Sequence, residues 1–329
     1  MQPFKAFRIH SGQGGDDARL ETIGLDDLAD GDVIIKGEYS SINYKDALAA
    51  TGTGKILRRY PLIGGVDIAG KVEESGDPRV PVGASVVVCG CGLSETHDGG
   101  FTQYSRVRGD WVNLLPEGLD TRTAMQIGTA GFTAGYAIHR MEQNGQRPEQ
   151  GPVLVDGATG GVGSLAVDML AGAGYPVTAL TSKAESADYL RSIGAADTLD
   201  LKVLELGSRP LEKALWAGAI DNLGGDVLGW LTRTTMPYGN IAAIGLAAGF
   251  TLNTTVMPFI LRGVSLLGIN SVGVPLAERS VVWQRIAGDL APRPLDRLAT
   301  REVPLDDIKG EFQRYIDGKV VGRTIIRLS

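Results

Sequence analysis

The chain has 329 residues, a formal net charge of −6 and a hydrophobic fraction of 43%. This length exceeds one typical hydrophobic core and predicts two domains. The acidic balance, without a basic block, argues against a nucleic-acid partner, and no apolar run is long enough to span a membrane. The only cysteines are Cys89 and Cys91. They form no disulfide framework and favour a reducing cytoplasm, and the N-terminus lacks the apolar core of a secretion signal.

The N-terminal third of the chain is predicted to be rich in short strands. Glycine turns separate segments of alternating apolar residues, and one short helix is expected within Ser41–Leu48. Short strands that precede any long helix favour a partly open barrel. The expected strands lie at Phe4–Ile9, Asp32–Ser40, within Pro61–Val72, at Ala84–Val88 and within Gly99–Tyr104.

From Leu119 onward the pattern becomes an alternation of strands and helices, which predicts a doubly wound parallel sheet between residues 125 and 262. Helices are expected at Ala124–Ile127, Gly131–Met141, Ala187–Ile193, Leu211–Ala217 and Gly229–Thr234. Strands are expected at Val153–Val155, Val177–Leu180, Thr198–Leu199, Trp216–Asn222 and Gly239–Gly245.

The remaining tail is too short to fold alone. It is expected to contain strands at Val264–Asn270 and Arg323–Leu328, and helices at Glu278–Leu290 and Phe312–Ile316. We therefore predict that the tail returns to the first domain. The expected domains are a catalytic domain at residues 1–124, a nucleotide-binding domain at 125–262 and a segment at 263–329 that completes the first.

The stretch from Pro152 to Lys183 carries the strongest functional signal. A strand is followed by the glycine turn Gly157–Gly163, a helix with apolar residues three and four apart, and a second strand. This strand, turn, helix and strand form the βαβ unit that binds dinucleotides, because glycines let the backbone approach a diphosphate at the helix N-terminus. Ala158 holds the first glycine position of the usual pattern, so the turn requires a negative φ at this alanine.

The end of the second strand points to the kind of nucleotide. NAD-binding units place an acid there for the ribose hydroxyls, whereas this strand runs into Thr181, Ser182 and Lys183. A hydroxyl and a cation suit a 2′-phosphate, so the sequence favours NADPH. The alternative is that Lys183 is a solvated loop residue.

Several stretches together resemble the medium-chain dehydrogenase/reductase superfamily. Ser41–Asp46, Gly65–Gly70, Gly128–Ala134 and Gly157–Gly163 carry this likeness, and the first and third look like the zinc-free quinone-oxidoreductase branch. Narrower stretches are similar to the acryloyl-CoA reductase group, which reduces acryloyl-CoA to propanoyl-CoA with NADPH. They are Pro237–Gly239, Gly245–Ala247, Thr254–Val264 and Gly322–Thr324.

The resemblance implies a β-rich GroES-like domain of partly open barrel type beside a Rossmann domain, in a homodimer paired through the apolar run Val264–Val272. It also implies which residues contact the cofactor: Tyr44, Thr159, Gly160, Gly161, Val162, Thr181, Ser182, Lys183, Leu246, Ile260, Ser271 and Arg323. The chain departs from the family where an arginine is often found. Asp197 stands near that place and would repel a 2′-phosphate, while Arg191 is a substitute that could instead point to solvent.

Metal chemistry is not expected. The positions that hold catalytic zinc in related alcohol dehydrogenases match Asn43, Val66 and Ala130, none of which is a usual zinc ligand. Cys89, Cys91 and His97 could hold a metal in one loop, but the favoured interpretation is a small buried thiol pair near a turn.

Without zinc, an alkene conjugated to a carbonyl is the natural hydride acceptor, since its β-carbon is already electrophilic. Tyr44 would contact the nicotinamide or relay a proton, or else be a packed tyrosine. Asn43 would donate to a substrate oxygen, or hold the turn. Asp67 is expected to serve a local structural network.

The predicted reaction is NADPH-dependent reduction of acryloyl-CoA. The loop Thr51–Tyr60, with Lys55, Arg58 and Arg59, could bind the phosphates of CoA or be a solvated loop tip. Two alternatives stay open for the whole chain, which are a quinone or enone oxidoreductase and a nucleotide-binding protein without turnover.

Overall fold

The computed structural model describes residues 2–12 and 17–329. The chain divides into two compact units. Unit 1 contains Met1–Thr129, Ser271–Ala287 and Ala299–Ser329, and unit 2 contains Ala130–Asn270 and Gly288–Leu298. The domain limits expected at 124/125 and 262/263 fall at 129/130 and 270/271, and Gly288–Leu298, which was expected in the returning segment, lies in unit 2.

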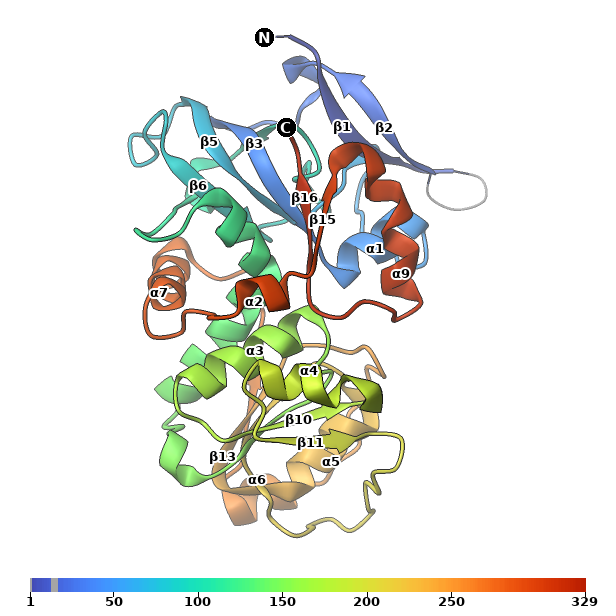
Figure 1. Cartoon of the computed structure of the whole chain (residues 1–329), viewed down its shortest axis with the longest axis vertical. Coiled ribbons are helices and arrows are strands. Elements are labelled where there is room, and N and C mark those ends of the chain that lie inside the picture. Colours follow the sequence, from blue (N-terminus) through green and yellow to red (C-terminus); the bar gives the residue numbers. More distant parts are fainter. Residues whose placement is uncertain (1, 13–16) are drawn as a thin grey trace. The chain divides into compact units, whose positions relative to one another are not determined.

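Unit 1 is built from two β-sheets (Figure 1). The smaller sheet has the order β2-β1-β4, and the larger has the order β15-β16-β3-β5-β6-β8 with β7 also paired to β3. Strand β16, from the C-terminal tail, runs antiparallel to β3, so the tail completes this sheet. The strands are β1 (Phe4–His10), β2 (Asp17–Ile23), β3 (Val33–Ile42), β4 (Leu62–Ile63), β5 (Asp67–Ser75), β6 (Ser85–Cys89), β7 (Tyr104–Val107), β8 (Asn113–Leu114), β15 (Arg301–Pro304) and β16 (Thr324–Arg327).

Apolar packing explains why the tail returns to unit 1. The ring of Phe312, in α9 (Phe312–Ile316), lies with its centroid 5.4 Å from that of Phe7 and 6.0 Å from that of Phe101. All three side chains are buried, so removing the tail would expose the aromatic core. Helix α9 also packs beside α1 (Tyr44–Thr51), as Figure 1 shows, and α7 (Leu276–Ala287) completes the helices of this unit.

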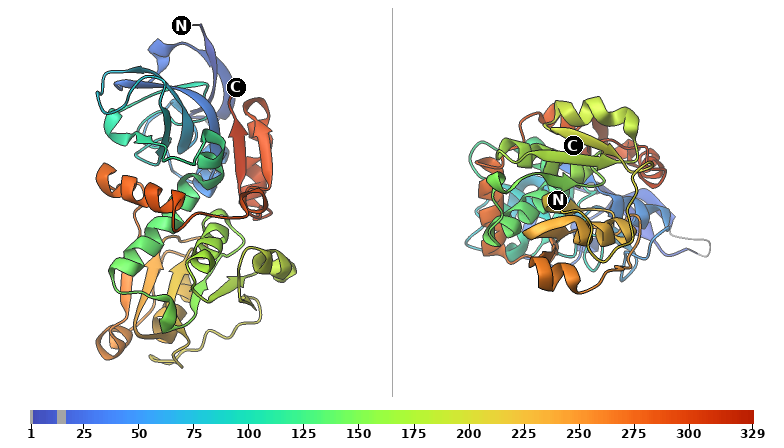
Figure 2. Two further views of the ribbon diagram at one scale, coloured as in Figure 1. Left: turned by 60° about the vertical axis from the view of Figure 1, so that its left-hand side comes forward. Right: turned by 90° about the horizontal axis from the view of Figure 1, so that it is seen from below.

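Unit 2 is a doubly wound α/β domain. Its parallel sheet has the order β11-β10-β9-β12-β13-β14, with α3 (Gly161–Gly172) and α4 (Ala187–Ser192) on one face and α5 (Gly225–Thr234) and α6 (Met257–Arg262) on the other (Figures 1 and 2). The strand order reverses between β9 and β12, and ligands of such sheets bind at this reversal. The strands are β9 (Val153–Val155), β10 (Val177–Thr181), β11 (Asp197–Asp200), β12 (Trp216–Asp221), β13 (Thr235–Ala243) and β14 (Ser265–Gly268).

The predicted fold class is confirmed, but one predicted helix is wrong. Residues 211–215 form no helix, because Glu212 N–H donates to the carbonyl of Arg233 and Leu215 N–H to that of Thr234. These donors are therefore used between segments rather than within a helical turn. Among the described residues, five short strands and α-helices were not expected from the sequence: β2, β8, β15, α6 and α8 (Leu295–Leu298).

The two helices expected at Ala124–Ile127 and Gly131–Met141 are the halves of one element, α2 (Thr121–Gln143). Gly128 separates them with φ 54° and ψ −161°, a conformation that suits only glycine. Among the described residues, no helix is long and apolar enough to cross a bilayer.

Candidate active site

The glycine turn of unit 2 has the backbone geometry that a close phosphate contact needs. Gly157 has φ 54°, and its carbonyl accepts the N–H of Gly160 at 2.9 Å. A Cβ on Gly163 would lie 2.4 Å from the carbonyl oxygen of Gly157, so only glycine lets the helix approach the turn. Ala158 is fully buried and is not among the described residues with positive φ, which meets the requirement placed on it.

Helix α3 begins directly in this turn. Its first residue is Gly161, with Gly160 as the N-cap, and no side chain caps the N-terminus. The N–H groups of the first turn are therefore open to an anion, and the helix dipole adds positive potential there. Gly160, Gly161 and Val162 are partly exposed. These features fit the diphosphate of a dinucleotide.

Thr181, Ser182 and Lys183 stand at the C-terminal end of β10. Thr181 is buried and its Oγ1 accepts the N–H of Lys183 at 3.1 Å, while Ser182 is exposed and Lys183 is half-buried. Burial lowers the pKa of the Lys183 ammonium, and the nearby Glu185 carboxylate opposes this shift. A partly desolvated cation gains more from a phosphate than a fully hydrated one.

The departure from the family pattern is visible on β11. Asp197 is exposed, and its carboxylate accepts the N–H of Thr198 at 2.8 Å. Arg191 donates to Asp188 at 3.3 Å and to Thr198 Oγ1 at 3.4 Å, so its guanidinium is held between α4 and β11.

The other predicted cofactor contacts differ widely in exposure. In unit 2, Leu246 and Ile260 are 67% and 72% exposed, and Thr159 is buried. Tyr44, Ser271 and Arg323 belong to unit 1. The carbonyl of Ser271 accepts a hydrogen bond from Arg279 Nη2 at 3.0 Å.

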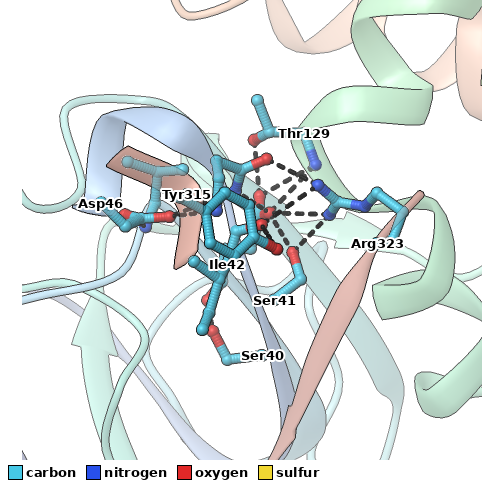
Figure 3. A network of polar contacts seen from close by, with 10 residues as sticks. Ser40, Ser41, Ile42, Asp46, Thr129, Tyr315 and Arg323 are labelled. Carbon is cyan, nitrogen blue, oxygen red and sulfur yellow. Dashed lines mark hydrogen bonds and ion pairs between the residues drawn. The ribbon is translucent and has the colours of Figure 1, made fainter. Parts of the chain in front are cut away.

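A buried polar network surrounds Asp67, the first residue of β5. Figure 3 shows its members Ser41, Thr129 and Arg323 close together. Asp67 Oδ2 accepts Ser41 Oγ at 2.5 Å and Asn43 Nδ2 at 2.7 Å. Asp67 Oδ1 accepts the N–H of Thr129 at 3.0 Å and its hydroxyl at 2.5 Å. The structural role expected for Asp67 is therefore confirmed.

Arg323 completes this network. Its side chain is 1% exposed, and its guanidinium donates from Nη2 to Ser41 Oγ at 2.6 Å and from Nη1 to Asn43 Oδ1 at 2.9 Å. A Cβ on Gly128 would lie 2.3 Å from Arg323 Nη2 and 2.9 Å from Asp67 Oδ2. The kink in α2 is thus the place where the backbone makes room for the ion pair.

Asn43 and Tyr44 lie at the start of α1, where the side chain of Asn43 is held by hydrogen bonds and that of Tyr44 is half-exposed. Asn43 Nδ2 reaches Asp67 Oδ2 and also Asp46 Oδ2, the latter at 3.3 Å, so both amide hydrogens are used within the network. These contacts fit the second expected role of Asn43, which is to hold the turn. Tyr44 is 50% exposed, and its hydroxyl makes no hydrogen bond with the described residues.

Asp46 links Asn43 to the following strand. Its carboxylate accepts the N–H of Asn43 at 2.8 Å and the N–H of Val66 at 3.0 Å, and its side chain is 1% exposed. Burial raises the pKa of Asp46 to about 7, and the charge of Asp67 adds to the increase.

The cations of the loop Thr51–Tyr60 are exposed. Lys55, Arg58 and Arg59 all face solvent, and Arg59 Nε donates to the carbonyl of Thr96 at 2.9 Å. Lys45 forms an ion pair with Glu95 nearby, and burial lowers its pKa, with the charge of Arg58 adding to the effect. Three exposed cations therefore lie in the loop that follows α1, while the charge of Lys45 is balanced by Glu95.

The loop with both cysteines offers no metal cluster among the described residues. Cys89 is buried and Cys91 half-buried, and both thiols are free. Burial raises the pKa of Cys89 well above its usual value, with Asp67 the next cause. The ring nitrogens of His97 lie 2.8 Å and 3.1 Å from the carbonyl oxygens of Asp30 and Asp98. At the zinc positions, Val66 and Ala130 are buried apolar residues.

The polar network was only partly visible in the sequence. Ser41, Thr129 and Gly128 were not singled out as site residues, although each lies in a stretch that resembles the family. In the structure, Ser41, Thr129 and Arg323 meet at the carboxylate of Asp67. These residues could have been found from their polar side chains, because hydroxyl, carboxylate and guanidinium groups form hydrogen bonds with one another when they are buried.

Known proteins resemble this chain along nearly its whole length. Residues 29–117 match the alcohol dehydrogenase GroES-like domain. The chain is 46% identical over 317 residues to the acrylyl-CoA reductase AcuI of Ruegeria pomeroyi, covering 95% of each chain. It is 44% identical over 326 residues to YhfP of Bacillus subtilis, which carries a quinone-oxidoreductase name, covering 99% of each.

Solved structures agree with this placement. The Salmonella enterica YhdH oxidoreductase in complex with NADP superimposes with a TM-score of 0.96 at 44% identity, covering 99% of this chain and 100% of that one. Bacillus subtilis YhfP with NAD bound gives a TM-score of 0.97 at 43% identity, covering 100% of both chains. The chain therefore belongs to the medium-chain dehydrogenase/reductase superfamily, in the zinc-free branch that includes AcuI and YhfP.

Proposed function

We propose that this chain, an NADPH-dependent oxidoreductase, reduces the α,β double bond of acryloyl-CoA to give propanoyl-CoA. The observation that carries the substrate proposal is the 46% identity to an acrylyl-CoA reductase along 95% of both chains. The uncapped N-terminus of α3 and the Gly157–Gly163 turn support the dinucleotide part.

The reaction needs little from the protein beyond positioning and charge stabilisation. When bound, NADPH supplies a hydride for the β-carbon of the substrate. The negative charge that results on the thioester oxygen needs hydrogen-bond donors, and the α-carbon needs a proton. Asn43, Val66 and Ala130 replace the usual zinc ligands, so polarisation by a metal is not part of this proposal.

Tyr44 is the residue that we assign to the reacting centre. It follows Asn43, whose amide is fixed by Asp67 and Arg323, so the start of α1 is held rigidly while the phenol stays half-exposed. A positioned phenol can contact the nicotinamide or relay a proton from water. We assign Asn43 the role of holding this turn.

The cofactor contacts divide by function. Thr159, Gly160, Gly161 and Val162 would hold the diphosphate, and Thr181, Ser182 and Lys183 would hold the 2′-phosphate. The resemblance to the family assigns further cofactor contacts to Leu246, Ile260, Ser271 and Arg323. For Arg323, the buried ion pair favours an indirect role, in which it positions Ser41 and Asn43.

We place the phosphates of the CoA ester on Lys55, Arg58 and Arg59. These exposed cations give the loop a local positive charge in a chain whose net charge is −6. Two further proposals concern the protein as a whole. The free thiols of Cys89 and Cys91 fit a reducing cytoplasm, and the exposed apolar surface around β14 fits a homodimer.

A second function is supported by a specific observation, the 44% identity to YhfP along 99% of both chains. The first alternative is therefore that the chain reduces a quinone or a free enone. The second alternative is that it binds a nucleotide without turnover. A CoA ester should depend on the exposed cations near α1, whereas a small neutral quinone should not.

One assay separates these functions. NADPH oxidation is measured with acryloyl-CoA, crotonyl-CoA and a benzoquinone side by side, before and after dialysis against a chelator. We expect the highest kcat/KM for acryloyl-CoA, unchanged by the chelator. Preference for the benzoquinone would replace our proposal by the alternative, and no oxidation with any acceptor would favour a protein without turnover.

A further inference from the structure

Two aspartates stand at the ends of neighbouring strands where the sheet of unit 2 reverses its order: Asp156 directly follows β9, and Asp221 is the last residue of β12. Strands β9 and β12 pair in parallel with Val155 opposite Ile220, so the next residues, Asp156 and Asp221, also lie opposite each other. Register partners point to the same face of a sheet. Both side chains are 0% exposed, so the two carboxyl groups lie side by side without access to solvent.

In each of these carboxyl groups, one oxygen accepts hydrogen bonds from the backbone and the other does not. Asp156 Oδ1 accepts the N–H groups of Asn222 at 2.7 Å and Leu223 at 3.1 Å, and Asp221 Oδ1 accepts that of Gly224 at 3.0 Å. The Oδ2 atom of each aspartate is buried and receives no hydrogen from any other described group. One proton between these two oxygens would satisfy both.

We propose that Asp156 and Asp221 share one proton in a carboxyl–carboxylate hydrogen bond, and that this pair is a positioning device for the cofactor site. The pair joins the glycine turn, which begins at Gly157, to the Asn222–Gly225 turn that follows β12. The part that concerns the cofactor rests on the proposed function, whereas the shared proton does not.

The backbone contacts show what the pair holds in place. Asn222 Nδ2 donates to the carbonyl of Asp156 at 2.7 Å, and the carbonyl of Asp221 accepts the N–H of Gly245 at 3.2 Å. The carbonyl of Leu223 accepts the N–H of Ala248 at 2.8 Å. The pair therefore lies between the segment with Thr159–Val162 and the segment with Leu246, both of which carry predicted cofactor contacts.

The electrostatic surroundings favour a retained proton. Burial raises the pKa of both carboxyl groups, and for Asp156 the charge of Asp221 adds to the increase. For Asp221, a hydrogen bond with Asp156 opposes the increase in pKa, as do the backbone N–H donors of its own turn. From the adjacent elements, Asp226 of α5 is exposed and Lys183 after β10 is half-buried, and neither is a cause of the shift at Asp221.

Loss of the shared proton would leave two adjacent negative charges in a buried site. Their repulsion would separate the glycine turn from the Asn222–Gly225 turn, and the cofactor site would lose its geometry. We therefore expect the affinity for NADPH to fall in alkaline solution because the protein, and not the nucleotide, loses a proton.

The first test uses the protein without nucleotide. Asp156→Asn keeps an oxygen for the N–H of Asn222 and offers a permanent N–H to Asp221. In the infrared difference spectrum of wild type minus this variant at neutral pH, we expect the carbonyl band of a protonated carboxyl group. If this band is absent from the difference spectra of both Asp156→Asn and Asp221→Asn, the proposal of a shared proton is wrong.

Unfolding gives a second readout on the same proteins. A carboxyl pKa raised in the folded state contributes stability at low pH that is lost as pH rises through that pKa. The free energy of unfolding of wild type should therefore fall more steeply with rising pH than that of Asp156→Asn. The control is Asp200→Asn, at the end of β11, which should follow wild type. Equal slopes for wild type and Asp156→Asn would contradict the proposal.

The third test measures NADPH affinity by fluorescence titration between about pH 6 and 9. Asp156→Asn should match wild type within about twofold at neutral pH, since the charge of the pair is kept, and its affinity should weaken less in alkaline solution than that of wild type. Some weakening should remain in both proteins, because burial lowers the pKa of the Lys183 ammonium that is proposed to bind the 2′-phosphate. Affinity several-fold tighter in Asp156→Asn at every pH would show that both carboxyl groups are ionised in wild type. If wild type binds no NADPH at all, the proposed function fails, while the infrared and unfolding tests still decide the shared proton.

Discussion

Arg323 and Asp67 form an ion pair that is closed to solvent, with Nη2 3.7 Å from Oδ2 and side-chain exposures of 1% and 0%. Arg323 precedes β16 in the C-terminal tail, and Asp67 begins β5 in the N-terminal part of the chain. The pair therefore joins the two ends of unit 1 at the turn that carries Asn43 and Tyr44. Since a buried charge is costly without its partner, both residues depend on each other.

Removing one partner should destabilise the protein strongly. For Arg323→Met we expect a loss of about 3–5 kcal/mol in the free energy of unfolding, measured by urea denaturation, because Asp67 stays buried without its cation. The matched control is Arg327→Met at the end of β16, where the pair with Glu302 is 3.9 Å long and the arginine is 53% exposed. It should cost less than about 1 kcal/mol. Similar losses in the two variants would contradict this account of the buried pair.

The nucleotide preference should depend on Lys183. If its ammonium binds the 2′-phosphate, Lys183→Ala should raise the Kd for NADPH by about 10-fold or more, because a hydrogen bond to a charged group contributes about 1.5–3 kcal/mol. The Kd for NADH should not change. Fluorescence titration measures both constants, and the exposed Lys202→Ala serves as the control. Equal wild-type affinities for NADPH and NADH would refute the preference.

The exposed cations near α1 should matter only for substrates that carry phosphates. The double variant Arg58→Ala with Arg59→Ala should raise the KM for acryloyl-CoA, and should affect methyl acrylate much less. The value of kcat would also fall if binding energy from the CoA part is used at the reacting carbons. Lys36→Ala, an exposed cation in β3, is the control. An unchanged kcat/KM for acryloyl-CoA would remove this loop from the site.

Stability should respond to pH through Asp46. Its pKa is raised from 3.8 to about 7 in the folded state, chiefly by burial, so the folded protein holds this proton more tightly than the unfolded chain. Its contribution to stability is present below about pH 4 and is lost as the pH rises through about 7. Asp46→Asn should flatten this part of the unfolding profile, whereas the exposed Asp26→Asn should leave it as in wild type. A profile that keeps its full slope in Asp46→Asn would exclude Asp46 as the source.

The edge of the parallel sheet should mediate assembly. Strand β14 lies at the end of the sheet, and Leu261, Leu266 and Tyr238 around it are 61%, 36% and 78% exposed. An exposed apolar edge invites pairing with a second copy. Light scattering at micromolar concentration should give at least twice 34.7 kDa, and Leu261→Lys with Leu266→Lys should reduce this to one chain. The control is Val203→Lys, which changes a residue that is 78% exposed elsewhere in unit 2. A wild-type mass of one chain would count against the homodimer.

Features encoded by neighbouring residues were predictable from the sequence. Strands β9 and β10 were expected within one residue of their observed limits, and the turn Gly157–Gly163 with a helix after it was expected between them, since local periodicity and glycine spacing determine them. The negative φ required at Ala158 and the structural role of Asp67 also follow from local chemistry. The resemblance to the family added the cofactor contacts, but only as positions in the chain.

Other features depended on partners far away in the chain. Strand β2 has few apolar residues and exists through its pairing with β1, and residues 211–215 were predicted as a helix although their N–H donors bind Arg233 and Thr234. Local propensity cannot show where such a donor finds its acceptor, because that choice is made by tertiary packing.

The sequence by itself determined the βαβ unit and the absence of the usual zinc ligands, because both depend on residue type and short-range spacing. Only the tertiary structure decided that Ser41, Asp67, Thr129 and Arg323 share one buried network, and that Asp156 lies opposite Asp221. Burial is the physical reason. A carboxylate acquires a definite partner and an altered pKa only when the folded chain removes it from water, and the sequence does not state which groups will be removed together.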